Sequence, residues 1–289
     1  MGVSLLWEAL AVILINLNVG ILGWTLHTLN MVRLFIQFHD MAHFSFFSSI
    51  TMNKVVGKMI GVYVHFPFAN WRDGHNHHHK HFGNLDRMDL SQTILFTKKQ
   101  YDEMKWPLKL IVRILREPVI FFLFTIQYVW FAVVGYNCVR KYGLFSSPVL
   151  EKIISVVLYF YIFGLLGLPV LKMYLSLHFA QALGTIMFHL QHSVNIPYRE
   201  RKMNWDFQRA ALEGSTFLDI PQVLKPFTNG IEYHHIHHLN TNVASYNIQE
   251  CHETFDGQDP EKLKWDRYNI NRVDIPLAIT SIESIFHWL

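Results

Sequence analysis

Cysteine is scarce in this chain of 289 residues, which contains only Cys138 and Cys251. Two distant cysteines provide neither a disulfide framework nor a CxxC metal motif, and a reduced, cytosol-facing site is compatible with that. Charge is also sparse, because Asp, Glu, Lys and Arg make up 16% of the residues, while 51% are apolar and 15% aromatic. A soluble domain of this length rarely needs so many aromatic side chains, so the composition disfavours an ordinary soluble protein.

Charged residues are almost missing from three long stretches. Glu8 is the only charged residue between Val3 and Val32, and residues 153–171 and 173–190 contain none. Each stretch is close to the ~20 residues that cross the hydrocarbon core of a bilayer. We therefore expect an all-α, integral, multi-pass membrane protein with about three to four transmembrane helices. Its apolar spans are expected near residues 5–31, 153–171 and 173–190.

Residues 119–134 form a shorter apolar stretch of 16 residues. If this stretch crossed the membrane, the later histidines would lie on the opposite face from the earlier ones, so we expect an interfacial or re-entrant segment. The second and third spans should form a hairpin joined at Lys172 with help from Pro169, and the N-terminal stretch should be one span. His27 lies within that span and would be costly there unless it faced neighbouring helices.

Basic residues accompany the apolar segments in two loops. They are Lys98, Lys99, Lys105, Lys109, Arg113 and Arg116, and then Arg199, Arg201, Lys202, Arg209 and Lys225. Basic loops mark the cytoplasmic side, so we expect one domain, residues 1–289, with a cytosolic helical cap of residues 39–118 and 191–289. A nucleic-acid partner is disfavoured, because these cations flank apolar spans where lipid headgroups would attract them. The N-terminus lacks a basic region and a small-residue cleavage site, so no removable signal peptide is expected.

Histidine, unlike cysteine, is abundant in this chain. The chain has 18 histidines, and most of them fall in four short clusters at residues 39–43, 75–81, 189–192 and 234–238. Histidines at i, i+3 and i+4 share one face of a helix, and the second and fourth clusters both contain this spacing. Imidazole is the commonest metal ligand. The clusters therefore predict a metal site with enough ligands for two metal ions.

Redox chemistry is the favoured interpretation of such a site. A structural zinc site uses four ligands, often including cysteine, and zinc has no redox chemistry. Iron tolerates nitrogen ligands and can activate dioxygen, so we expect oxygen-dependent attack on an unactivated C–H bond of an apolar substrate. A membrane metal transporter or metal-binding protein is the alternative from another class. The clusters argue against transport, because they lie outside the apolar spans whereas transporters bind ions near the bilayer midplane.

Four histidine-bearing segments carry a specific resemblance. They read HDMAH, WRDGHNHHHKHFGNLDRMD, FHLQH and GIEYHHIHHL. These segments resemble the membrane fatty-acid desaturases with three histidine boxes, and most closely the delta-12/omega-6 acyl-lipid branch. The likeness extends from about Arg33 to the last residues and includes non-histidine positions 204–206, 211–215 and 246–253.

The resemblance implies a cofactor, a reaction and a ligand set. The cofactor would be two non-haem iron ions, which use dioxygen and two external electrons to insert a cis double bond into an acyl-lipid or acyl-CoA. The implied ligands are His39, His43, His75, His78, His79, His192, His234, His237 and His238. No fused haem-binding domain is recognisable, so a separate ferredoxin or b-type cytochrome is implied as donor. In a eukaryotic-type cell the expected location is the endoplasmic reticulum membrane.

Some features leave the outcome of the reaction open. A fatty-acyl hydroxylase or acetylenase of the same superfamily would use the same histidines. The chain departs from its nearest relatives at Met41-Ala42, at His189 and at Glu232, and it starts about one membrane helix later than typical members. Carboxylate or amide groups usually orient ligating imidazoles. The candidates for this role are Asp40, Asp86, Asp89, Asp206 and Asn229, whereas His77, His81 and His235 are not expected to be ligands.

Overall fold

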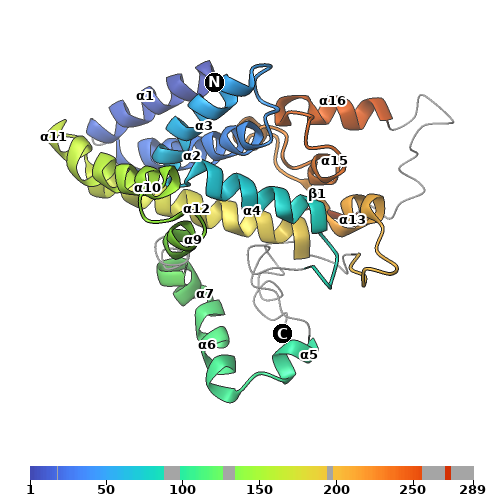
Figure 1. The fold of residues 1–289 in the computed structure, drawn as a ribbon. Coiled ribbons are helices and arrows are strands. Elements are labelled where there is room, and N and C mark those ends of the chain that lie inside the picture. The colour runs from blue at the N-terminus through green and yellow to red at the C-terminus, as the bar shows by residue number, and fades with distance from the viewer. Residues whose placement is uncertain (18, 88–97, 126–133, 194–197, 256–270, 275–289) are drawn as a thin grey trace.

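A computed structural model of the chain describes residues 1–17, 19–87, 98–125, 134–193, 198–255 and 271–274 (Figure 1). The first half contains α1 (Gly2–Asn16), α2 (Gly20–Ala42), α3 (Ile50–Val64), α4 (Phe68–His81), α5 (Lys98–Asp102), α6 (Trp106–Arg116), α7 (Pro118–Ile120), the π-helical η1 (Phe121–Thr125) and α9 (Val134–Tyr142). The second half contains α10 (Ser147–Val157), the π-helical η3 (Leu158–Ile162), α11 (Phe163–Leu165), α12 (Val170–Ser193), α13 (Phe207–Gly214), β1 (Thr216–Asp219), α14 (Lys225–Thr228), α15 (His234–Leu239), α16 (Ser245–Phe255) and β2 (Asn271–Asp274).

The fold is mostly helical, as expected, with one small departure. β1 and β2 form a parallel two-stranded sheet, in which Thr216 pairs with Asn271. β1 also receives support from the loop before α15, because the Leu218 amide donates to the Glu232 carbonyl at 3.0 Å. The sheet therefore helps to hold the segment that leads into the last histidine cluster.

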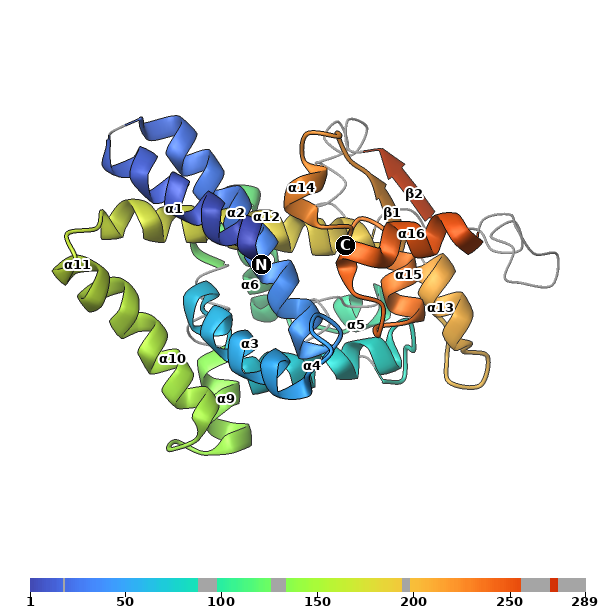
Figure 2. The ribbon, with the colours of Figure 1, turned by 90° about the horizontal axis from the view of Figure 1, so that it is seen from above.

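The N-terminal apolar stretch is two helices, so the prediction of a single span near residues 5–31 was wrong. α1 ends at Asn16 and α2 begins at Gly20. The two helices run side by side (Figure 2), and the Asn30 side chain donates to the Ser4 carbonyl at 3.0 Å. A Cβ atom at Gly23 would lie 2.8 Å from the Ile15 nitrogen, so glycine permits the helices to meet closely just after the turn. Asn and Gly are poor helix formers, which explains a break at this point.

Polar side chains fill the interface of this helical pair. His27 is fully buried, and its Nε2 lies 2.9 Å from Glu8 Oε1 and 3.3 Å from the Tyr63 hydroxyl. Asn30 donates to the other oxygen of Glu8 at 2.8 Å. His27 therefore faces neighbouring helices, as its position in an apolar stretch required.

The second apolar pair has its turn earlier than expected. The helical run Ser147–Leu165 is, among the described helices, the one that is long and apolar enough to cross a membrane by length and composition. It ends just before Gly167, whose φ of +70° reverses the chain ahead of Pro169, and Lys172 lies inside α12 rather than in the turn. Glycine adopts this left-handed conformation without the steric clash that other residues suffer. The prediction of a joint at Lys172 was wrong by a few residues, and α10–α11 and α12 form a V (Figure 2).

The segment predicted to be interfacial, residues 119–134, is described only in part. α7 and η1 cover its beginning, and residues 126–133 lie outside the described residues. α5 and α6 precede it and extend from the body of the molecule as an arm (Figure 1). Trp106 and Ile111 of α6 are exposed, at 75% and 51%. The arm therefore presents apolar side chains outward, which is compatible with the predicted contact with a membrane surface.

α2 is the central helix of the molecule. It packs against α1, α3 and α12, and Phe38 and Met41 near its end are completely buried. The turns of the two apolar pairs lie at one end of the molecule, and α13, α15 and α16 lie at the other (Figures 1 and 2). α2 therefore connects the apolar end with the end that carries the histidines.

Candidate metal centre

The nine histidines expected to be ligands come together from four helices. α2 supplies His39 and His43 near its end, and α12 supplies His192 near its end. α4 supplies His75, His78 and His79, and α15 supplies His234, His237 and His238. All nine lie around one buried region, where their ring centroids approach to between 4.3 and 6.5 Å.

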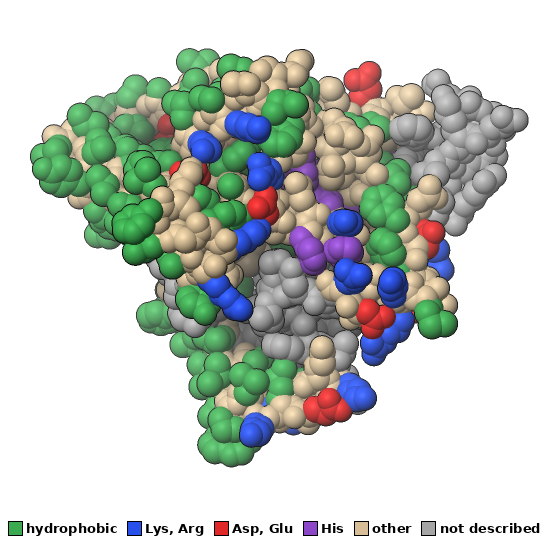
Figure 3. Space-filling view, in the orientation of Figure 1, with side chains coloured by type: hydrophobic (Ala, Val, Ile, Leu, Met, Phe, Trp, Pro, Cys, Tyr) green, Lys and Arg blue, Asp and Glu red, His purple; other side chains and the backbone are tan. Residues whose placement is uncertain are grey.

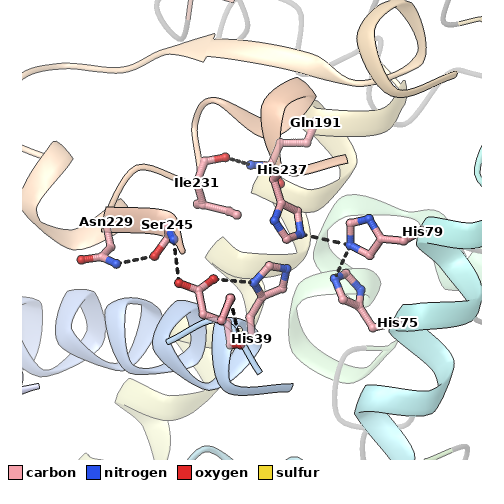
Figure 4. A network of polar contacts seen from close by, with 10 residues as sticks. His39, His75, His79, Gln191, Asn229, Ile231, His237 and Ser245 are labelled. Carbon is pink, nitrogen blue, oxygen red and sulfur yellow. Dashed lines mark hydrogen bonds and ion pairs between the residues drawn. The ribbon is translucent and has the colours of Figure 1, made fainter. Parts of the chain in front are cut away.

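Two packing contacts hold the short helices α4 and α15 in place. The first amide of α4, at Phe68, donates to Glu151 Oε2 of α10 at 2.7 Å. A carboxylate at this position also stabilises the positive end of the helix dipole. Gln191 of α12 donates to the Ile231 carbonyl just ahead of α15 at 2.8 Å (Figure 4). Neither Glu151 nor Gln191 was singled out from the sequence, because each contact joins segments that are far apart in the chain.

The Nε2 atoms of the histidines point toward one another. His79 Nε2 lies 2.9 Å from His75 Nε2 and 3.0 Å from His237 Nε2 (Figure 4). His192 Nε2 lies 3.2 Å from His78 Nε2 and 3.0 Å from His234 Nε2. Two groups of potential ligand atoms, each within 4.8 Å, result: His39, His43, His75, His79 and His237 in the first, and His78, His192 and His238 in the second. His234 adjoins the second group through its contact with His192.

Hydrogen bonds between the imidazole rings cannot satisfy all of these ring nitrogens. A neutral ring nitrogen carries either one proton or one lone pair. The Nε2 atoms of His79 and of His192 each face two other Nε2 atoms, so each can form only one good hydrogen bond. The buried Nε2 atoms of His39, His43 and His238 have no hydrogen-bond partner among the described residues. Lone pairs that converge in this way fit a bound cation.

The spacing also fits metal coordination. Ligands at right angles on a metal with bonds of ~2.1 Å lie roughly 3.0 Å apart, whereas tetrahedral ligands lie roughly 3.4 Å apart. The shortest Nε2–Nε2 distances, 2.9 to 3.2 Å, lie near these values, and all ligand atoms of each group lie within 4.8 Å of one another. The region therefore suits metals held by several imidazoles.

Burial keeps the imidazoles in the form that binds metals. Burial lowers the pKa of His78 to about 3 and places the pKa of His79 and of His237 well below the ordinary value. The positive charge that neighbouring imidazoles would carry acts in the same direction. Neutral imidazole is the ligand form, so the site is ready for metal at neutral pH.

Asp40 is the polar group that orients a ligand on α2. Its Oδ1 lies 3.1 Å from His39 Nδ1, and its Oδ2 accepts the Ser245 amide at 2.8 Å. Asn229 in turn donates its side-chain amide to the Ser245 hydroxyl. Two of the five candidates for this role, Asp40 and Asn229, therefore lie in a chain of contacts that ends at His39.

Replacing Asp40 with asparagine is expected to lower metal affinity by about 10- to 100-fold, because partners of ligating imidazoles contribute that much. The amide can keep the contact with Ser245 but cannot hold His39 Nδ1–H as a carboxylate does. Metal content after dialysis against graded chelator would measure the effect. Asp86→Asn is the matched control, because Asp86 is bound to Arg201 and the Lys202 amide and not to a histidine. Equal metal retention by both variants would remove Asp40 from this role.

Asp86 and Asp206, two other candidates for this role, serve elsewhere. Asp206 caps the N-terminus of α13 by accepting the Arg209 amide at 2.8 Å, and Asp89 lies outside the described residues. His235 turns away from its neighbours in α15, and its Nε2 lies 3.2 Å from His252 Nδ1. His77 and His81 lie together on another face of α4, with ring centroids 4.6 Å apart. The structure thus separates these three histidines from the two groups, as expected.

Aromatic rings surround the imidazoles, and the sequence did not reveal their role. The Trp71 ring stacks on His75 at 4.2 Å with an angle of 25°. Phe82 lies 4.6 Å from His192 and 4.7 Å from His238, and Phe188 lies 4.5 Å from His192. These rings fill the space beside the ligands and exclude water. Trp71 lies one helical turn before His75 on α4, and Phe82 lies one turn after His78, directly after the end of α4. This spacing of four residues is the sequence signal that could have indicated both rings.

Comparison with known proteins agrees with this geometry. The family model for fatty acid desaturases matches residues 14–269. A fatty acid desaturase of Bacillus subtilis is 31% identical over 229 residues, which cover 77% of this chain and 64% of that protein. An sn-1 oleoyl-lipid 12-desaturase of Picosynechococcus is 27% identical over 254 residues, covering 85% of this chain and 70% of the relative.

A third relative is named for its electron donor. It is the sn-1 acyl-lipid omega-3 desaturase (ferredoxin) of Synechocystis, 26% identical over 247 residues, which cover 80% of this chain and 65% of that protein. The chain thus spans roughly two thirds of the length of these relatives. The match to the family model includes all four helices that carry the nine histidines. The chain belongs to the fatty acid desaturase family.

Proposed function

We propose that this protein is a membrane-bound desaturase that introduces a cis double bond into an acyl chain, using dioxygen and two electrons from an external donor. The observation that carries the proposal is the convergence of nine histidines, all but His43 buried, into two adjoining groups of ligand atoms. The family and the relatives named oleoyl-lipid 12-desaturases support an acyl-lipid substrate and delta-12/omega-6 regiochemistry.

Two iron ions are the metals that we infer for the two groups. The first would be held by His39, His43, His75, His79 and His237, and the second by His78, His192, His234 and His238. Zinc prefers four tetrahedral ligands and has no redox chemistry, whereas iron accepts imidazole ligands in higher coordination numbers. Bound iron would supply dioxygen activation and one-electron chemistry. The donor set contains no carboxylate, so it adds no negative charge to the metals.

The protein's own groups prepare this site for its chemistry. Asp40 orients the His39 ring, and Trp71 restricts the His75 ring by stacking on it. Phe82 and Phe188 exclude water from the second group. Ligands held by packed helices need little reorganisation during a reaction, which is the general requirement of a preorganised site.

The same residues would serve a hydroxylase or an acetylenase, and the product decides between these reactions. A metal transporter would place its ligands near the middle of the membrane. Here the ligands lie near the ends of α2 and α12, at the end of the molecule opposite the turns of the apolar pairs (Figures 1 and 2). This position favours an enzyme that draws an apolar substrate from the bilayer.

We infer that the two apolar pairs are anchored in the membrane with the histidines on the cytosolic side. In a eukaryotic-type cell this would be the endoplasmic reticulum membrane. The support is the common position of both turns at one end and of α13, which carries the basic Arg209, at the other. A glycosylation acceptor in a lengthened loop at Gly167 should be modified, and modification near Lys105 instead would reverse this orientation.

The test of the reaction is a fatty-acid methyl-ester profile of yeast that expresses the chain. A new diunsaturated product should appear with the wild-type chain and be missing with His78→Ala. Mass spectrometry after derivatisation would locate the bond. A hydroxylated product would identify a hydroxylase. Folded, iron-loaded protein that makes no product from endogenous lipids or from supplied acyl-CoA and acyl-lipid, with donor present, would contradict the proposal.

A further inference from the structure

A pocket at the surface leads directly to the proposed ligands. It has a volume of about 380 Å³ and is lined by Ala42, His43, Phe44, Asn76, His79, Lys80, Phe207, His238, Leu239, Asn240 and Thr241. His43, His79 and His238 come from both groups of ligands. A partner that fills this pocket would therefore be separated from either metal by little more than one imidazole ring.

The pocket lies on the side of the molecule away from the turns of the apolar pairs. Its wall includes Ala42, the last residue of α2, whereas the first of those turns precedes Gly20 at the start of the same helix. α2 has 23 residues, which at ~1.5 Å per residue separates the two ends by about 34 Å. In the proposed membrane orientation the pocket faces the aqueous side, where a soluble partner can reach it and where an acyl chain in the bilayer would not enter.

The charge around the pocket is positive. Lys80 lines it, is exposed, and has no carboxylate partner among the described residues. Lys54 and Arg72 lie over the Phe44 ring, 5.6 and 5.9 Å from its centroid, but Arg72 also forms an ion pair with Asp73 at 2.8 Å, so the positive charge of the rim comes chiefly from Lys54 and Lys80. No Asp or Glu of the described residues lines the pocket. Figure 3 shows histidine side chains at the surface over the end of α4, with Lys and Arg side chains beside them and a few Asp or Glu side chains nearby.

The pocket also has the composition of a protein interface. Phe44, Phe207 and Leu239 supply apolar contact area, and Phe207 is 42% exposed. Asn76, Asn240 and Thr241 surround them with amide and hydroxyl groups. An aromatic centre with a polar, charged rim is the usual anatomy of a protein–protein contact.

From these observations we propose that this pocket and its basic rim are the docking site of an acidic one-electron carrier protein, which delivers electrons through the histidines that line the pocket. The proposal rests on the proposed function, because desaturation consumes two electrons: an acyl chain, dioxygen, two electrons and two protons yield the alkene and two waters. Complementary charge steers such an encounter and makes its rate strongly dependent on salt.

The experiment compares two ways of supplying electrons. One is continuous turnover with a reduced ferredoxin and its reductase as probe donor, and the other is a single turnover of enzyme that has been reduced chemically beforehand. Lys80→Glu and Lys54→Glu should reduce the donor-driven kcat/KM by about 10-fold or more at low ionic strength, with the difference shrinking at high salt. Both variants should keep the single-turnover yield of the wild type. Lys105→Glu on the arm, where no histidine lies nearby in the chain, is the matched control.

Three results would overturn the docking site. Unchanged donor-driven rates of both variants at every salt concentration would place the donor elsewhere. If the two variants lose as much activity in the pre-reduced single turnover as in donor-driven turnover, the substituted charges act on the metal centre and not on donor docking. A raised KM for the acyl substrate with unchanged donor dependence would make the pocket a headgroup site. Failure of wild-type enzyme in the pre-reduced single turnover would instead contradict the proposed function itself.

Discussion

Replacing His237 or His78 with alanine should abolish product formation and remove metal from the site, with a loss of activity of at least ~100-fold. The two residues represent the two groups of ligand atoms, since His237 faces His79 in the first group and His78 faces His192 in the second. Each variant loses one of the few nitrogens that hold an ion, and the empty space cannot be filled by another ligand. Each should therefore lose chiefly the ion of its own group, measured by elemental analysis of purified protein.

His77→Ala is the matched control, because His77 is on the same helix next to His78. Its ring packs against His81 rather than against the two groups of ligands. We expect this variant to keep most of its activity and all of its metal. Activity losses of equal size in His77→Ala and His78→Ala would mean that α4 presents a different set of histidines to the metals.

Gly230→Ala is expected to have the largest effect on stability among the glycine substitutions. Gly230 has a φ of +91°, and a Cβ atom there would lie 2.1 Å from the Ser245 carbonyl oxygen, which is backbone and cannot rotate away. Strain at such a position and the displacement of the adjoining loop together should destabilise the protein by roughly 2–4 kcal/mol. The loop also carries Asn229, which bonds Ser245, and Ser245 holds Asp40. Metal affinity should therefore fall together with the temperature of unfolding.

Gly184→Ala provides the comparison for this prediction. Gly184 lies inside α12, and a Cβ atom there would meet nothing within 4 Å. Alanine in a helix is favoured over glycine by roughly 0.5–1 kcal/mol, so this variant should be as stable as the wild type or slightly more stable. Thermal unfolding monitored in detergent, with metal content measured in parallel, would test both variants. A Gly230→Ala protein that keeps its unfolding temperature would contradict the close contact with Ser245.

The helical class, the histidine clusters and the family could be recognised from the sequence. The clusters were readable because i, i+3 and i+4 spacing is a local property of a helix, and the structure does bring all nine histidines together. Asp40 was also readable, since it is next to His39. The breaks in the apolar stretches were harder. The break between Asn16 and Gly20, and the turn at Gly167, depend on how each helix packs against its neighbour, which hydropathy does not report.

The division of the histidines between two groups required the tertiary structure. On α4, His75 and His79 belong to the first group, whereas His78 belongs to the second. Residues four apart differ by only about 40° around a helix, and neighbours differ by about 100°, so one cluster can serve two sites. Which site each ring reaches depends on how α4 is placed against α2, α12 and α15. Ser245, Gln191, Phe82 and the basic pocket likewise depend on contacts between distant segments.

The sequence by itself thus determined the chemistry that this protein can hold: neutral imidazoles at helical spacing, next to apolar segments. Those properties follow from residue type and local periodicity. Only the tertiary structure decided which imidazoles share an ion, which side chains hold them and where a soluble partner can approach. These depend on distances between elements, such as the 2.8 Å contact from Ser245 to Asp40, that arise when the helices pack.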